Sequence, residues 1–155
     1  MIVDKLARLP GMRLSQMQDI GGCRAILPDR QAVAAVLARI ERNWEVRGQP
    51  RNYSANPTPQ GYRAMHVIVA RDGRLVEIQL RTPREHSWAV AVERFSHQLG
   101  QDLKSGVGPP AMLRYLRLLS ELTELRERGA PADQHLAGEF ERLAPQVAKL
   151  LKRDN

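Results

Sequence analysis

The sequence lacks several features that define large classes of proteins. It has a single cysteine, Cys23, so no disulfide can form within the chain, and a reducing cytoplasm is the expected compartment. No apolar run is long enough to span a membrane, and no signal peptide, with basic and then apolar residues, opens the chain. Internal repeats and low-complexity tracts are missing too. The length of 155 residues suits one domain, and a hydrophobic fraction of 43% is enough to form a core.

Two functional patterns are also missing. His86 and His97 fall on one predicted helix, but their spacing does not match a metal-binding pair. Basic residues are not interleaved with aromatic residues, as they are in proteins that bind single-stranded nucleic acid.

Acidic residues are in deficit, and the net charge is +7. Residues 1–108 hold 16 Lys and Arg against 10 Asp and Glu, whereas residues 109–155 hold 8 against 7. This excess favours an anionic ligand such as a nucleotide or RNA for the first part of the chain. The solvated surface of an ordinary basic protein would give the same numbers.

Hydrophobic spacing and turn residues predict an α/β or α+β domain with a mixed β-sheet flanked by helices, and we take α+β as the expected fold class. The predicted helices cover residues 2–9, about 13 residues from 28–29, 83–99, 111–128 and 133–152. The predicted strands cover residues 23–27, 44–48 and the two arms of a hairpin on either side of residues 72–73. The strand at residues 23–27 is expected to be buried, with Cys23 in the core, and Pro145 is expected to kink the last helix. The last two helices predict a C-terminal helical hairpin that either packs on the domain or mediates self-association.

The hairpin is the most informative stretch. Asp72-Gly73 is typical of a type I′ turn, which requires positive φ at both central positions. In that register Gln79 lies opposite His66, and Glu77 becomes a diagonal neighbour of His66. The predicted polar face carries His66, Ile68, Glu77, Gln79 and Arg81. The predicted core face carries Val67, Val69, Val76, Ile78 and Leu80.

The loop before the hairpin distinguishes two interpretations of this face. A half-exposed hairpin with a solvated polar face is slightly favoured by the hairpin residues alone. However, the Pro-rich segment 56–61 is rigid and places the ring of Tyr62 just before the strand, which suits a nucleotide base better than bulk water. Asp19, before Gly21-Gly22, predicts a turn more than a metal ligand when it is taken alone.

Three motifs occur in order: Asp19-Ile-Gly-Gly-Cys-Arg24, Gly61-Tyr-Arg-Ala-Met-His66 and Glu77-Ile-Gln-Leu-Arg-Thr82. Together they resemble the synthetase domain of the RelA/SpoT family, the alarmone (p)ppGpp synthetases, from about residue 2 to about residue 106. The resemblance implies a nucleotidyltransferase-like fold and transfer of pyrophosphate from ATP to the 3′-hydroxyl of GDP or GTP, with Mg²⁺ as cofactor. It implies a synthetase domain over residues 1–106. Residues 109–155 would be a helical hairpin like those that assemble small family members into homo-oligomers.

The resemblance also implies roles for individual residues. Asp19 and Glu77 match the family's metal-binding carboxylates, and Glu77 would help to deprotonate the attacking hydroxyl. Tyr62 matches the ring that stacks on the acceptor guanine. The remaining matches contact phosphates or support the site: Lys5 toward ATP, His66 and Arg24 near the phosphates, and Gln79 and Arg81 beside them.

The chain departs from the family pattern at three points. Thr58 stands where a Lys is usual, and Asn52 stands where an Asp often precedes the loop tyrosine. The family's basic ATP-binding segment corresponds to a region upstream of Met1, so weak ATP binding is expected. Two alternatives therefore stay open: a toxin-like relative that modifies tRNA 3′ ends or makes adenosine alarmones, and a catalytically weakened remnant that binds a guanine nucleotide or mediates assembly.

Overall fold

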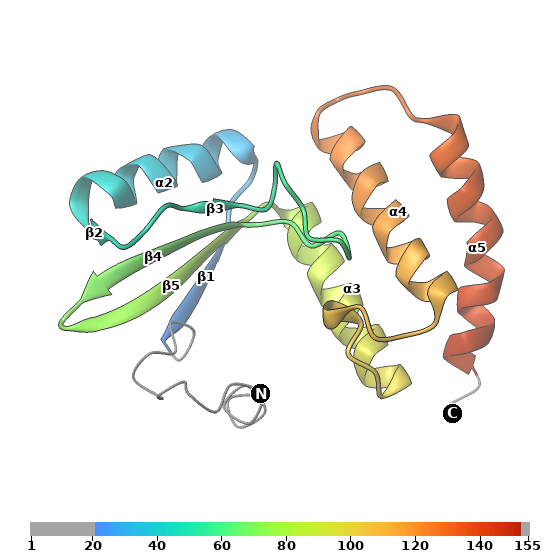
Figure 1. The fold of residues 1–155 in the computed structure, drawn as a ribbon. Coiled ribbons are helices and arrows are strands. Elements are labelled where there is room, and N and C mark those ends of the chain that lie inside the picture. Colours follow the sequence, from blue (N-terminus) through green and yellow to red (C-terminus); the bar gives the residue numbers. More distant parts are fainter. Residues whose placement is uncertain (1–20, 153–155) are drawn as a thin grey trace. The chain divides into compact units, whose positions relative to one another are not determined.

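A computed structural model describes residues 21–152 of the chain. These residues form an α+β fold with a mixed sheet and four α-helices, as expected (Figure 1). The strands are β1 (Gly22–Ile26), β2 (Glu45–Val46), β3 (Arg51–Asn52), β4 (Met65–Arg71) and β5 (Arg74–Arg81). The helices are α2 (Arg30–Asn43), α3 (Pro83–Leu99), the 3-10 turn η2 (Leu103–Ser105), α4 (Pro110–Glu127) and α5 (Gln134–Lys152). The predicted helix at residues 2–9 lies outside the described residues.

The chain divides into two compact units. The first comprises the described residues up to Arg51 together with Met65–Arg81, and the second comprises Asn52–Ala64 and the residues from Thr82 onward. The first unit therefore holds the predicted polar face, and the second holds Tyr62 and the last three α-helices.

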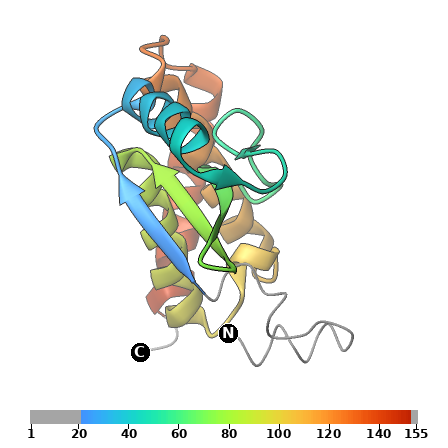
Figure 2. The same ribbon diagram turned by 90° about the vertical axis from the view of Figure 1, so that its left-hand side faces the viewer.

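The sheet has the strand order β1-β5-β4-β2, with β3 paired to β4 off this path. β1 runs parallel to β5, whereas β4 is antiparallel to both β5 and β2, and the strands lie side by side in two orthogonal views (Figures 1 and 2). The turn between β4 and β5 has φ of 49° at Asp72 and 73° at Gly73, as a type I′ turn requires. The pairs Arg71 with Arg74 and His66 with Gln79 confirm the predicted register.

The core of the first unit forms between the aliphatic face of the sheet and α2. Asp29 caps the start of α2 by accepting a 2.8 Å hydrogen bond from the amide of Ala32, which fixes where the helix begins. The buried core residues are Val33, Ile40, Met65, Val67, Val69, Ile78 and Leu80. The opposite sheet face is thereby left for the polar side chains.

The second unit is built on α3, α4 and α5. Thr82 and Glu85 form a reciprocal capping box, and Pro83 follows at the first turn, so α3 begins where the sequence predicts. Trp88 is 4% exposed, and its indole N–H donates to the carbonyl of Leu116 at 2.8 Å. The core of this unit contains Trp88, Ala89, Val92, Leu103, Met112, Leu116 and Val147. α5 continues through Pro145.

One expectation about β1 is wrong. Cys23 is exposed, and Ile26 on the same strand is 48% exposed, so residues 23–27 are not a buried strand. The physical reason is position, because β1 lies at the edge of the sheet that residues 21–152 form, with β5 as its neighbour. Within this segment, Ala25 and Leu27 pack partly against the core.

In the described part of the chain, 21–152, every helix is too short or too polar to cross a membrane.

Candidate active site

The polar face of the β4–β5 hairpin brings an imidazole and a carboxylate together. His66 lies on β4 and Glu77 on β5, and the register makes them diagonal neighbours. The His66 Nδ1 atom lies 3.0 Å from the Glu77 Oε1 atom. The two side chains are only 13% and 17% exposed, so water competes weakly for this contact. The predicted pairing of these residues is confirmed.

Gln79 continues the contacts along β5. Its Nε2 group donates to the Glu77 Oε2 atom at 3.0 Å, and its Oε1 atom accepts from the Arg81 guanidinium at 3.0 Å. Residues 77, 79 and 81 share a face because side chains alternate along a strand. The amide is suited to this place, since it donates on one side and accepts on the other.

The line of contacts includes Arg81, which is only 2% exposed. Burial of a guanidinium is costly unless its N–H groups are hydrogen-bonded. The bond to Gln79 therefore links a buried cation to the catalytic candidate Glu77 through one neutral side chain. This line of contacts fixes the orientation of the Glu77 carboxylate, because His66 contacts one of its oxygens and Gln79 the other.

Arg24 lies beside this line of contacts. β1 pairs in parallel with β5, and Arg24 is the partner of Gln79 in that register, so it belongs to the polar face. It is exposed. Lys5 and Asp19, the other two predicted site residues on the N-terminal side, lie outside the described residues.

Tyr62 lies in the second unit, on the loop 52–64. Its amide donates to the Thr58 hydroxyl at 3.1 Å, and its carbonyl accepts from the Thr58 amide at 3.2 Å. Its ring is half-buried, with the Tyr53 ring edge-on at 5.9 Å and the Trp88 ring tilted at 6.3 Å between centroids. These contacts fix the loop, in line with its expected rigidity.

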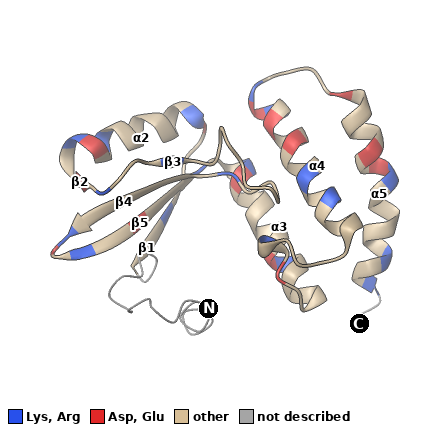
Figure 3. Cartoon of the chain, in the orientation of Figure 1, with Lys and Arg blue, Asp and Glu red and all other residues tan. Residues whose placement is uncertain are grey.

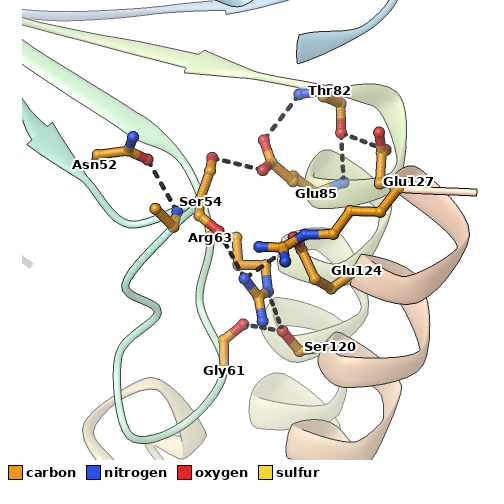
Figure 4. A network of polar contacts seen from close by, with 11 residues as sticks. Asn52, Ser54, Gly61, Arg63, Thr82, Glu85, Ser120, Glu124 and Glu127 are labelled. Atoms are coloured by element: carbon orange, nitrogen blue, oxygen red, sulfur yellow. Dashed lines mark hydrogen bonds and ion pairs between the residues drawn. The ribbon is translucent and has the colours of Figure 1, made fainter. Parts of the chain in front are cut away.

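Sequence reasoning missed Arg63, which follows Tyr62 in the second motif. It is 9% exposed, and it binds groups from the loop and from α4 (Figure 4). Ser120 and Glu124 of α4 are also buried, four residues apart on a helix whose spacing predicts a plain apolar stripe. The sequence signal for these contacts was the presence of two polar residues, Ser120 and Glu124, at helical spacing within an otherwise apolar stripe.

Protein side chains alone do not build a metal site among residues 21–152. These residues contain no group of three or more His, Cys, Asp or Glu side chains arranged to hold a metal ion. Mg²⁺ commonly takes only one or two carboxylates from the protein and completes its shell with water and substrate phosphate. Glu77 supplies one hard oxygen donor of the required kind, so the donor chemistry fits.

Comparisons with known proteins show which family the chain resembles over most of its length. The sequence model described as "Region found in RelA / SpoT proteins" matches residues 1–98. The rice protein GTP diphosphokinase CRSH1, chloroplastic, from Oryza sativa subsp. japonica is 32% identical over 142 residues. That match covers 79% of this chain and 24% of the rice protein, so the chain spans about a quarter of that relative's length. GTP pyrophosphokinase from Photobacterium angustum is 29% identical over 79 residues, which cover 48% of this chain and 10% of that protein.

A solved structure is similar over most of the chain. Small alarmone synthetase 1 from Bacillus subtilis, bound to its product pppGpp, superposes with a TM-score of 0.68 at 26% sequence identity. The superposition covers 83% of this chain and 69% of that protein. The similarity therefore extends well beyond residue 98 and includes helical residues that the family's sequence model does not match.

Proposed function

Because this chain belongs to the RelA/SpoT family, we propose that it is a pyrophosphokinase that transfers pyrophosphate from ATP to the 3′-hydroxyl of GDP or GTP. The product would be the alarmone (p)ppGpp. The observation that carries the proposal is the hydrogen-bonded line His66, Glu77, Gln79 and Arg81 on one face of the hairpin. This line belongs to the family's second and third motifs, and it holds a carboxylate in a fixed orientation.

Glu77 has the central role in the proposed reaction. Its carboxylate accepts the proton of the acceptor 3′-hydroxyl, whose oxygen forms a bond to the β-phosphorus of ATP. The bond between that phosphorus and the bridging oxygen to the α-phosphate breaks, and AMP leaves. A fixed base within reach of the hydroxyl lowers the barrier by correct orientation and proton transfer. His66 and Gln79, one on each carboxylate oxygen, provide that orientation.

We assign Mg²⁺ as the metal, held by Glu77 and Asp19, where it would neutralise charge on the transferring phosphates. Its ligands are expected to be those two carboxylates with substrate phosphate and water. The oxygen chemistry of Glu77 supports this assignment.

The remaining residues are proposed to bind the nucleotides. Tyr62 would stack on the acceptor guanine, since a partly exposed ring on a fixed loop suits a base. Lys5 would contact ATP phosphates, and Arg24 would contact phosphates at the edge of the polar face. We further propose that residues 109–155 form a module added to a transfer domain at 1–106, and that it packs on that domain or joins copies of the chain. A reaction on ATP and guanine nucleotides, and one exposed thiol, suit the cytoplasm.

The test is a transfer assay with ATP labelled on the γ-phosphate and with GDP, GTP, ADP or tRNA as acceptor. The proposal expects label in a guanosine product with either GDP or GTP, dependent on Mg²⁺. Label in an adenosine product, or on tRNA, would contradict this function and show one of the toxin-like activities instead. No transfer to any acceptor, at any magnesium concentration, would contradict enzymatic activity of this chain.

A further inference from the structure

The loop that carries Tyr62 is bound to α4 by a buried set of contacts, here called the Arg63 network: Ser54, Gly61, Arg63, Ser120 and Glu124. The Arg63 Nε group donates to the Ser120 hydroxyl at 2.9 Å, and the Arg63 NH1 group lies 3.2 Å from the Glu124 carboxylate. The same NH1 group donates to the carbonyl of Ser54 at 2.6 Å (Figure 4). One guanidinium thus joins the loop to two side chains of α4.

Gly61 forms a second connection between the loop and α4. Its carbonyl accepts a 2.6 Å hydrogen bond from the Ser120 hydroxyl. A Cβ atom at position 61 would lie 2.9 Å from the Ser120 Cβ, and φ at Gly61 is +97°, which side chains rarely adopt. The main chain on the N-terminal side of Tyr62 is therefore pressed directly onto α4, while Arg63 holds the C-terminal side.

The other part of the loop is bound to α3. The Ser54 hydroxyl donates to the Glu85 carboxylate at 2.6 Å, and that carboxylate also accepts from the Thr82 amide at 3.0 Å (Figure 4). Glu85 is 2% exposed, so this contact is shielded from water. The loop is thus held at Ser54 by α3 and around Tyr62 by α4.

We infer that Ser120 and Glu124 of α4 are positioning residues for acceptor binding, acting through Gly61 and Arg63 to set the orientation of the Tyr62 ring. The inference rests on the proposed function, because it takes the guanine of GDP or GTP as the ligand of that ring. It assigns to α4, which lies beyond the residues 1–98 that the family's sequence model matches, a part in recognition of the acceptor. None of these network residues needs to touch the nucleotide.

The expected loss of GDP affinity follows from the fraction of time that the loop spends in the arrangement that binds GDP. If a variant holds the bound arrangement only about a tenth of the time, the apparent dissociation constant for GDP rises about tenfold, since it varies inversely with that fraction. Binding of ATP, which does not use Tyr62, is expected to stay unchanged. If Ser120 and Glu124 had a purely structural role, variants at these positions would have lower thermal stability, but the folded protein would bind GDP with unaltered affinity.

The chain offers matched variants for the test. Glu124→Gln weakens the ion pair with Arg63, and Ser120→Ala removes the hydroxyl that joins Arg63 to Gly61. Glu139→Gln is the control, because Glu139 forms a 2.6 Å ion pair with Arg114 of α4 and does not belong to the Arg63 network. Arg128→Gln is a second control, because it removes the exposed Arg128 that pairs with Glu124 and leaves the Arg63 network in place.

Two measurements on the full chain decide the question. Calorimetry with GDP should show about tenfold weaker binding for Glu124→Gln and for Ser120→Ala, and wild-type affinity for Glu139→Gln and Arg128→Gln. Calorimetry with a non-hydrolysable ATP analogue should show the same affinity in all four variants. Hydrogen exchange in the absence of nucleotide should show faster exchange over residues 52–64 in Glu124→Gln and Ser120→Ala. GDP affinity equal to that of the wild type in both variants would overturn the inference, whether or not exchange is faster. Wild-type protein that binds neither GDP nor GTP would overturn the proposed function itself, and this inference with it.

Discussion

At the scale of single residues, substitution of Glu77 is the most direct test of the proposed catalytic site. Glu77→Gln removes the negative charge and the basicity but keeps the size of a half-buried side chain, so no cavity opens. We expect pyrophosphate transfer to fall by about 10²–10⁴-fold, as for the loss of a general base. Initial rates with saturating ATP and GDP measure the effect, and circular dichroism checks the fold.

Glu45→Gln is a suitable control for that substitution. Glu45 is an exposed acid on β2, paired with Arg47 at 2.7 Å, and its removal should leave the rate unchanged. Turnover of Glu77→Gln at the wild-type rate, with magnesium present, would rule out the assigned role.

Gln79 is predicted to act on the rate through the orientation of Glu77. Gln79→Met keeps the volume but removes both the donor to Glu77 and the acceptor for Arg81. Loss of catalytic alignment of this kind lowers kcat by about 10–100-fold, while KM for the acceptor changes little. Gln98→Met is the control, because Gln98 donates to the carbonyl of Leu151 in the second unit. An equal fall in kcat in both variants would show that the effect is general destabilisation.

At the scale of elements, the β4–β5 turn can be tested by itself. Gly73 has φ of +73°, and a Cβ added there would have no atom within 4 Å, so Gly73→Ala adds backbone strain without a clash. We expect the free energy of unfolding to fall by about 1–2 kcal/mol, the cost of the left-handed region for an L-residue. Urea denaturation measures this. Gly138→Ala in α5 is the control, because Gly138 is helical and equally open, and it should be neutral or stabilising.

The elements differ in how far the sequence determines them. The hairpin and the starts of α2 and α3 follow from local chemistry: Asp72-Gly73, the cap Asp29 and the Thr82–Glu85 box each act within a few residues. The exposure of Cys23 depends on which strand lies at the sheet edge, which no local pattern contains. The bond from Arg63 to Ser120 joins residues 57 apart, so neither residue signals the other in the sequence.

The contact between α4 and α5 gives a pH dependence. Arg114 donates two hydrogen bonds to Glu139, at 2.7 and 2.6 Å, and these bonds lower the pKa of Glu139 below that of a free carboxyl. A group whose pKa is lowered on folding stabilises the fold above its unfolded pKa, and this stabilisation is lost as the pH falls through the folded value. Thermal melts below about pH 5 should therefore show a shallower loss of stability in Glu139→Gln than in wild type. Parallel profiles for the two proteins would contradict this.

At the scale of the whole molecule, the charges on α4 and α5 bear on the proposed choice of a nucleotide over a long nucleic acid as ligand. Acidic as well as basic residues occur along α4 and α5 (Figure 3). Several cations among the described residues are paired with acids, including Arg114 with Glu139 and Lys104 with Glu93. A mixed surface of this kind offers little continuous attraction to a phosphate backbone. This supports the proposal that the net charge of +7 serves small anionic substrates.

Ligand binding should be visible in the stability of the whole chain. GDP that binds the native state alone stabilises it by about 2.7 kcal/mol at a concentration 100 times its dissociation constant. Tyr62→Ala removes a base-stacking interaction worth about 1–3 kcal/mol, which weakens binding by about 5–150-fold. At the same GDP concentration, the rise in Tm caused by the ligand should therefore be much smaller in Tyr62→Ala than in wild type. The rise is compared, and not the Tm itself, because the Tyr62 ring also contacts Tyr53 and Trp88.

Tyr115→Ala separates a general effect of losing an aromatic ring from loss of the acceptor site. The Tyr115 ring stacks on Phe140 at 4.4 Å between centroids, so its removal should lower Tm in the absence of ligand. The rise in Tm with GDP should nevertheless stay close to that of wild type, because Tyr115 lies outside the loop 52–64 and the Arg63 network. Scanning fluorimetry of the three proteins over a series of GDP concentrations gives both quantities. Equal ligand-induced shifts in Tyr62→Ala and wild type would show that the guanine does not stack on Tyr62.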